Sequence, residues 1–189
     1  MLEPLLAPVA AVQRLIEQLD DQGVIIGGVA VSLLGQPRLT ADADALILLS
    51  VEELPQLMEL ARKEGLQPRI ADAVAFARRS RVVLLRHQES NIDVDISLGL
   101  LPFEVETVER STEHQAGTLR IRLPTPEDLI ILKAVAHRPK DMLDIEAVIA
   151  AQAHLDTGRI AFWVRQFADV LEAPEIWTDV EKLLRKANI

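Results

Sequence analysis

Asp42 and Asp44 are the residues whose type and spacing most clearly point to chemistry. They stand at the beginning of an apolar run that continues to Leu49. In an extended strand, residues two positions apart point to the same side, with alpha carbons ~6.7 Å apart at ~3.3 Å per residue. Two like charges on one face repel each other, and burying them unpaired is costly. Hard oxygen ligands suit Mg²⁺, so the pair predicts a site for a divalent cation.

A second acidic pair repeats this pattern later in the chain. Asp93 and Asp95 alternate with apolar residues, so the acids share one face of a predicted strand. If this strand lies beside the first, three or four carboxylates meet on one patch, and their repulsion favours a bound cation. The alternative is that both pairs are strand charges facing water. We predict a metal-binding cluster of Asp42, Asp44 and one aspartate of the second pair.

Upstream, Gly27-Gly28 separates a short apolar run from a short helix-like segment. Missing side chains at such a junction let a phosphate group approach the backbone N–H groups at the helix start. A simple tight turn is the alternative. Gly28 precedes Asp42 by 14 residues (42 − 28), enough for one short helix and a returning strand. We therefore expect the glycines and the first acidic pair to face one pocket.

These residues require a sheet with helices to position them. Apolar residues at alternating steps of three and four predict a helix over residues 3–22, and shorter patterns predict helices over Val29–Leu34 and from Ser50 to about Gly65. Strands are predicted at Val24–Ile26, Ala41–Leu49, Arg81–His87, Ile92–Leu98 and Gly117–Leu123. We expect the strands at 81–87 and 92–98 to pair as an antiparallel hairpin.

The character of the chain changes after Pro124. Thr125 can cap a helix with Pro126 at its first position, and later helices are predicted to start at Pro139, Asp156 and Pro174. The resulting class is α/β (α+β), with a mixed sheet flanked by helices. We expect a core over residues 1–123 and a C-terminal helical region over residues 124–189 that packs on it.

Composition narrows the function further. The 189 residues are 49 % hydrophobic and 26 % charged, as in a globular domain, and no apolar run approaches the ~20 residues that span a bilayer. The absence of cysteine excludes thiolate zinc sites and cysteine nucleophiles. We expect a cytoplasmic protein with no membrane association. A net charge of −9 argues against general attraction to polyanions, although a local basic groove or a charged strand edge remains open for Arg78, Arg79, Arg81 and Arg86.

The segments Ile26-Gly27-Gly28, Asp42-Ala43-Asp44 and Val94-Asp95-Ile96, at these spacings, resemble the nucleotidyltransferase superfamily that includes DNA polymerase beta. Further segments resemble small bacterial members related to abortive-infection toxins and antitoxin nucleotidyltransferases: Gly27–Ala30, Arg38–Asp42, Pro126–Leu129 through Lys133, and Arg138–Asp144. The likeness covers residues 20 to 150. It implies a nucleotidyltransferase core in the region before Pro124.

The resemblance also implies roles for the site residues. The glycine pair would hold a triphosphate, Asp42 and Asp44 would bind two Mg²⁺ ions, and a third aspartate would assist the attacking hydroxyl. Asp95 best matches that third acid, although Asp93 lies on the same face. Two departures stand out: Gly28 occupies a position that is often serine in the family, and an alanine separates the first two acids where bulkier apolar residues are usual.

Three more residues are candidate phosphate contacts. Arg38 and Thr40 flank the first acidic pair, and Lys133 lies seven residues beyond Pro126 (133 − 126) in a predicted helix. A lysine facing the pocket would neutralise triphosphate charge. The alternative for this lysine is an ion pair with Asp128, Asp141 or Asp144.

The first functional hypothesis is an enzyme that uses Mg²⁺ or Mn²⁺ to move a nucleoside monophosphate from an NTP to a hydroxyl. The acceptor is a protein side chain, an RNA such as a tRNA end, or a small molecule. The alternative is a catalytically weak antitoxin or regulatory module that keeps the fold and binds a toxin-antitoxin partner. Transfer of label from an NTP in a cell extract separates the two.

Overall fold

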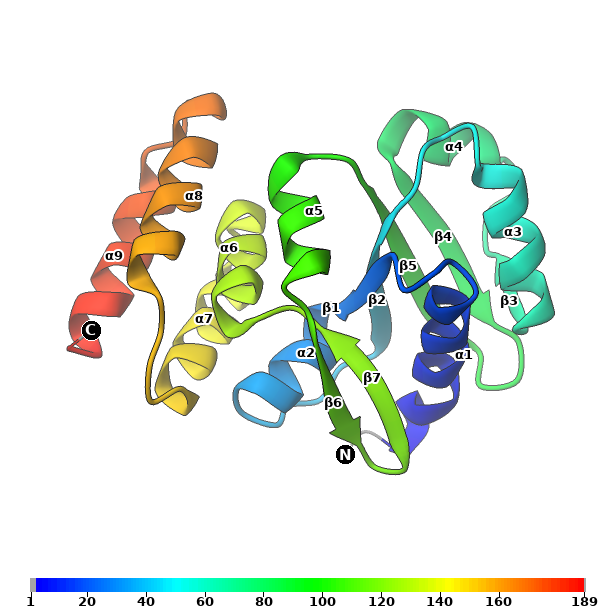
Figure 1. The fold of residues 1–189 in the computed structure, drawn as a ribbon, viewed down its shortest axis with the longest axis horizontal. Helices are drawn as coiled ribbons and strands as arrows, with labels where there is room; N and C mark the ends of the chain where they lie inside the picture. Colours follow the sequence, from blue (N-terminus) through cyan, green and yellow to red (C-terminus); the bar gives the residue numbers. More distant parts are fainter. Residues whose placement is uncertain (1–2, 189) are drawn as a thin grey trace. The chain divides into compact units, whose positions relative to one another are not determined.

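The computed structural model describes residues 3–188 (Figure 1). Contacts between alpha carbons divide the chain into two compact units. The first unit contains the residues up to Val29 together with Arg38–Pro124, and the second contains Ala30–Pro37 together with the residues from Thr125 onward. The combination of a mixed sheet with helices confirms the predicted fold class. The division at residue 124, with the helical region packed on the core, stays a prediction.

A five-stranded sheet in the order β1-β2-β5-β4-β3 is the framework of the first unit. The strands are Gly23–Ile26 (β1), Asp42–Leu48 (β2), Leu66–Pro68 (β3), Val82–His87 (β4) and Ile92–Gly99 (β5). β2 and β5 run parallel, and the other neighbouring strands run antiparallel, including the predicted β4–β5 pair. A separate hairpin consists of Thr112–Ala116 (β6) and Leu119–Leu123 (β7).

The helices that accompany this sheet are Glu3–Leu5 (η1), Leu6–Glu17 (α1), Gly27–Leu34 (α2), Leu54–Lys63 (α3), Ala73–Ser80 (α4) and Pro102–Glu109 (α5). α1 packs against β1 and β2, α3 against β3, and α4 against β4 (Figure 1). The third predicted helix starts later than expected, at Leu54 instead of Ser50. Pro55 therefore falls in the first turn, where its missing N–H leaves no helical hydrogen bond unmade.

The two ends of β2 have different surroundings. Near its carboxyl end, Leu46 packs with Val24 of β1 and Val108 of α5 on the same face that carries the acids. Asp42 and Asp44 lie at the other end of that face and are only half-buried. The apolar part of the strand thus anchors it in the core while the acidic part stays accessible.

The second unit is helical, as predicted for the chain after Pro124. Its C-terminal helices are Pro126–Ala136 (α6), Pro139–Ala151 (α7), Thr157–Val170 (α8) and Glu175–Lys186 (α9). Thr125 caps α6, because its hydroxyl oxygen accepts a hydrogen bond from the Asp128 N–H at 3.2 Å. Gln152 at the end of α7 donates to the Leu34 carbonyl at 2.6 Å, which ties the end of α2 into this unit. No helix within residues 3–188 is long and apolar enough to cross a membrane.

Candidate functional site

The sheet register brings the two acidic pairs together. In the parallel β2–β5 pair, Asp42 lies opposite Asp93 and Asp44 lies opposite Asp95. Residues paired across neighbouring strands point to the same face, so all four carboxylates share one patch. The adjacency that the sequence could only assume is therefore present in the fold.

Gly27 lies directly against this patch. It begins α2 with φ +65°, a backbone conformation that favours glycine. A Cβ atom built on Gly27 would overlap the Asp44 carboxylate, with Asp44 Cγ only 2.6 Å away. Two features therefore favour glycine at position 27: the positive φ of the turn and the closeness of the Asp44 carboxylate. This contact brings the first glycine next to the first acidic pair, and a shared phosphate-binding pocket stays a prediction.

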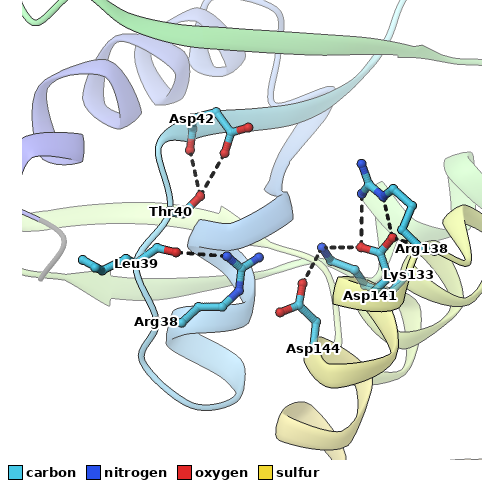
Figure 2. Close-up of polar contacts among 8 residues, drawn as sticks. All are labelled: Arg38, Leu39, Thr40, Asp42, Lys133, Arg138, Asp141 and Asp144. Carbon is cyan, nitrogen blue, oxygen red and sulfur yellow. Dashed lines mark hydrogen bonds and ion pairs between the residues drawn. The ribbon is translucent and has the colours of Figure 1, made fainter.

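Gly28 faces Thr40 instead of a carboxylate. A Cβ on Gly28 would overlap the Thr40 hydroxyl and would lie 2.6 Å from Thr40 Cβ and 3.3 Å from an Arg38 guanidinium nitrogen. The Thr40 hydroxyl donates to Asp42 Oδ1 at 2.9 Å, and Arg38 donates to the Leu39 carbonyl at 3.1 Å (Figure 2). Thr40 thus occupies the space that the Cβ of a serine at position 28 would need.

Arg69 is a site residue that the sequence analysis missed. Its Nη1 lies 2.8 Å from Asp93 Oδ2, and its Nη2 lies 2.9 Å from Asp95 Oδ1 and donates to Asp95 Oδ2 at 3.2 Å. The Arg69 backbone N–H donates to the Leu84 carbonyl at 3.1 Å, which fixes it at the end of β3. β3 has three residues and ends in Pro68, so no periodicity in the sequence predicts it.

Asp93 and Asp95 differ in electrostatic environment. The hydrogen bond from Arg86, at 2.7 Å, is the main reason why the pKa of Asp93 lies below its usual value, and Arg69 adds to this effect. Burial raises the pKa of Asp95 above its usual value; Arg69 opposes this rise, and the charges of Asp42 and Asp93 add to it. The two side chains are similarly exposed, and Asp95 differs from Asp93 in lying within the field of Asp42 and in having no hydrogen bond from Arg86 within residues 3–188.

The donor set fits a divalent cation at β2. Within residues 3–188, no three acidic or histidine side chains are already arranged as a metal-binding group. Asp42 and Asp44 nevertheless offer two oxygen-donor side chains on one face, and Mg²⁺ typically uses one or two carboxylates together with water and substrate phosphates. Asp95 Oδ1 is a buried atom that accepts no hydrogen bond of good geometry from the described residues, although it lies 2.9 Å from Arg69 Nη2. Asp42, Asp44 and Asp95 remain the predicted metal ligands.

Lys133 lies in a buried ionic cluster of the second unit (Figure 2). Its Nζ is 3.1 Å from Asp141 Oδ1 and 2.8 Å from Asp144 Oδ2, and only 8 % of its side chain is exposed. Arg138 also donates to Asp141, through Nε at 2.6 Å. This is the ion-pair alternative that the sequence left open. A role for Lys133 in contacting triphosphate stays a prediction.

The four arginines considered for a basic groove have separate contacts. Arg81 donates to the carbonyl oxygens of Leu98 at 2.9 Å and Leu49 at 3.3 Å. Arg86 pairs with an acid of the site, whereas Arg78 and Arg79 are exposed on α4. Of these four arginines, Arg86 alone contacts the carboxylate patch among the described residues, and Arg69 also pairs with the aspartates there.

Comparison with known proteins gives a matching family model and two similar folds. Residues 4–170 match the family model described as "Nucleotidyltransferase of unknown function (DUF6036)". No curated protein matches the sequence. Among solved structures, the antibiotic-resistance factor ANT(2'')-Ia is similar with a TM-score of 0.56 and 15 % identity, over 89 % of this chain and 95 % of that one.

A second similar structure is an antigenic nucleotidyltransferase-like protein from Paracoccidioides brasiliensis. It aligns with a TM-score of 0.54 and 14 % identity, over 92 % of this chain and 90 % of that one. At these identities the two structures establish a shared fold, and the family model carries the assignment of the sequence.

Proposed function

We propose, from the premise that this chain belongs to the nucleotidyltransferase family DUF6036, that it transfers a nucleoside monophosphate from an NTP to an acceptor hydroxyl with Mg²⁺ or Mn²⁺. Membership of the family supports nucleotidyl transfer in general. The metal, the residues that carry the reaction and the hydroxyl acceptor are the proposed part.

One observation carries the proposal: the register that sets Asp42 beside Asp93 and Asp44 beside Asp95, with Gly27 against the Asp44 carboxylate. Arg69 and Arg86 offset the charges of Asp93 and Asp95, but Asp42 and Asp44 add two further like charges to the same patch, which favours a bound cation. The glycine turn at the start of α2 adds backbone N–H groups that suit phosphate. Carboxylates and phosphate-binding backbone in one site match nucleotidyl transfer.

The proposed reaction divides the work among residues of the first unit. The acceptor oxygen forms a bond to the α-phosphorus, the bond from that phosphorus to the bridging oxygen breaks, and pyrophosphate leaves. Asp95 takes the proton of the hydroxyl. A divalent cation held by Asp42 and Asp44, with Asp95 as the third candidate ligand, would offset the charge of the phosphates.

The phosphate-binding residues are proposed from their positions. Gly27 and Gly28 leave space beside the backbone for the triphosphate. Thr40 supplies the hydroxyl that the glycine at position 28 lacks, and Arg38, whose guanidinium lies near Gly28, supplies positive charge. Lys133 is retained as a proposed contact to the distal phosphates.

Incubation of the purified protein with labelled NTPs, Mg²⁺ and cell extract tests the proposal. Wild type should move label into a protein, an RNA or a small metabolite, and Asp44→Asn should lose this transfer while remaining folded. Binding of NTP without transfer to any fraction would favour the alternative of a weakly catalytic or regulatory module. Transfer by Asp44→Asn at the wild-type rate would reject the proposed site.

A further inference from the structure

A row of polar residues continues from the carboxylate patch toward the edge of the sheet. Asp42 lies opposite Asp93, Asp93 lies opposite Arg86, and Arg86 lies opposite Gln67 of β3. These residues therefore occupy the same sheet face. The strand spacing of ~4.8 Å puts Arg86 about 10 Å from Asp42, on the far side of Asp93. The row leads from the proposed metal pair to a region that the nucleotide roles above do not use.

A cavity of about 300 Å³ lies at this end of the row. Its lining residues are Gln67, Pro68, Arg69, Arg86, Gln88 and Asn91. Its volume suits a small molecule. Two of its residues, Arg69 and Arg86, contact the aspartates of β5 directly, so the cavity borders the proposed reaction centre.

The chemistry of the lining favours a particular kind of ligand. Arg86 uses Nε to contact Asp93, and its two terminal nitrogens have no other ion pair or hydrogen bond within residues 3–188. A guanidinium end with these donors matches the oxygen atoms of a phosphate or carboxylate. Gln67, Gln88 and Asn91 add amide groups that bind hydroxyls. A cationic ligand would meet the end of the Arg86 guanidinium here, whereas both terminal nitrogens of Arg69 already contact Asp93 and Asp95.

We propose that this cavity binds the acceptor, and that the acceptor is a small molecule that carries an anionic group in addition to the reacting hydroxyl. The register makes Arg86 and Asp95 diagonal neighbours on adjacent strands, with alpha carbons about 7–8 Å apart, so that one small molecule can reach both side chains. The anionic group pairs with Arg86 while the hydroxyl reaches Asp95. This inference rests on the proposed function, since it assigns the acceptor of that reaction.

A matched set of hexoses tests the inference: glucose, glucose 6-phosphate, glucuronate and 6-amino-6-deoxyglucose. They share ring hydroxyls and differ in the charge at one carbon. Binding is measured by NMR titration without nucleotide. Glucose 6-phosphate or glucuronate should bind at least about tenfold more tightly than glucose, the amine should bind less tightly than glucose, and signals of Arg86, Gln88 and Asn91 should shift. The stronger of the two anions tells whether phosphate or carboxylate is preferred.

Arg86→Gln should remove this preference for anions, and Arg79→Gln, a change of an exposed arginine on α4, should leave it intact. Arg86→Lys keeps the charge without the guanidinium fork and should give an intermediate preference for anions. This variant also replaces Arg86→Gln in the test if the glutamine variant does not fold. Equal binding of all four sugars, equal losses in Arg86→Gln and Arg79→Gln, or shifts confined to residues 27–40 would overturn the inference.

Label transfer from NTP, measured together with binding, distinguishes failure of this inference from failure of the proposed function. Anion binding that depends on Arg86, without label transfer to any acceptor, would keep the cavity as a binding site and reject its role as acceptor site. Label transfer to neutral sugars at the same rate in wild type and Arg86→Gln would support nucleotidyl transfer and reject an anionic acceptor.

Discussion

Two groups of aspartates in this protein have basic partners but differ in burial. On the sheet, Asp93 and Asp95 pair with Arg69, and their side chains keep 35 % and 33 % exposure. In the helical unit, Asp141 and Asp144 pair with Lys133 and are exposed by 0 % and 3 %. Buried charges must be matched to avoid a desolvation cost, whereas half-buried ones remain available to ligands. The same residue types therefore form a half-exposed patch, which is the proposed binding site, in one unit and a buried stabilising network in the other.

The largest expected effect separates the two acids of β5. Asp95→Asn should lower nucleotidyl transfer by about 100- to 10,000-fold, because removal of a general base acts on the transition state. NTP binding should change little. Asp93→Asn is the matched control on the same face and should be milder, since Arg86 and Arg69 already hold that carboxylate. Full turnover by Asp95→Asn with an inactive Asp93→Asn would reverse the assignment.

The next largest expected effect is a loss of stability in the helical unit. Lys133→Ala should lower the free energy of unfolding by about 3–5 kcal/mol, because it removes the buried cation that Asp141 and Asp144 share. Chemical denaturation measures this loss. Exposed Lys182, which pairs with Asp179 at 2.9 Å, provides the control, and Lys182→Ala should cost less than about 1 kcal/mol.

The same variant addresses the proposed phosphate contact. If Lys133 contacts the distal phosphates, Lys133→Ala weakens binding of NTP more than binding of AMP. Equal affinities for both nucleotides in variant and wild type, together with the stability loss, would restrict Lys133 to the ionic cluster.

A compensating pair of substitutions tests the space around Gly28. Gly28→Ser should weaken NTP binding about tenfold, because overlap with Thr40 costs roughly 1–3 kcal/mol. Thr40→Gly in the same protein removes the overlap while the new serine supplies a hydroxyl, so affinity should return to near the wild-type value. Gly158→Ser, at the start of α8, should leave affinity unchanged. A double variant as weak as Gly28→Ser would mean that Thr40 does more than fill this space.

The smallest effect is a pH dependence of stability in the helical unit. Burial acts to raise the pKa of Asp141, but hydrogen bonds from Arg138 and Lys133 outweigh it and hold this pKa below its usual value. The stabilisation is therefore fully present above the unfolded pKa of ~3.9 and is lost as pH falls through the lower folded value. Denaturation of wild type and Asp141→Asn from pH 6 to pH 3 should show the stability difference shrinking with acid. A constant difference would contradict this sign.

The sequence predicted the parts of the fold that rest on periodicity and capping. The acid-bearing strands, the glycine turn and the starts of the C-terminal helices were found, because alternation, Gly-Gly and Thr-Pro pairs are local signals. β3, α4, α5 and β6 were not predicted, since these elements are short or lack a clear apolar pattern. Arg69 was missed for the same reason: its place beside Asp93 and Asp95 depends on β3 pairing with β4.

Lys133 is a residue that the sequence identified but whose environment it could not predict. Its position in the predicted helix allowed both a phosphate contact and an ion pair with Asp141. Only burial distinguishes a stabilising ionic cluster from exposed charges that are available to a ligand. Charge alone could not do so, because neither burial nor the partner of a lysine is encoded in local sequence.

The central claim is that the β2 acids bind nucleotide through a divalent cation. Calorimetry of NTP binding, with Mg²⁺ and with EDTA, in wild type and Asp44→Asn, tests it most directly. We predict that Mg²⁺ raises the affinity of wild type and that Asp44→Asn loses most of this gain, because carboxylates and phosphates both need the cation. Equal binding of NTP in EDTA, or the same metal dependence in Asp44→Asn, would contradict the claim.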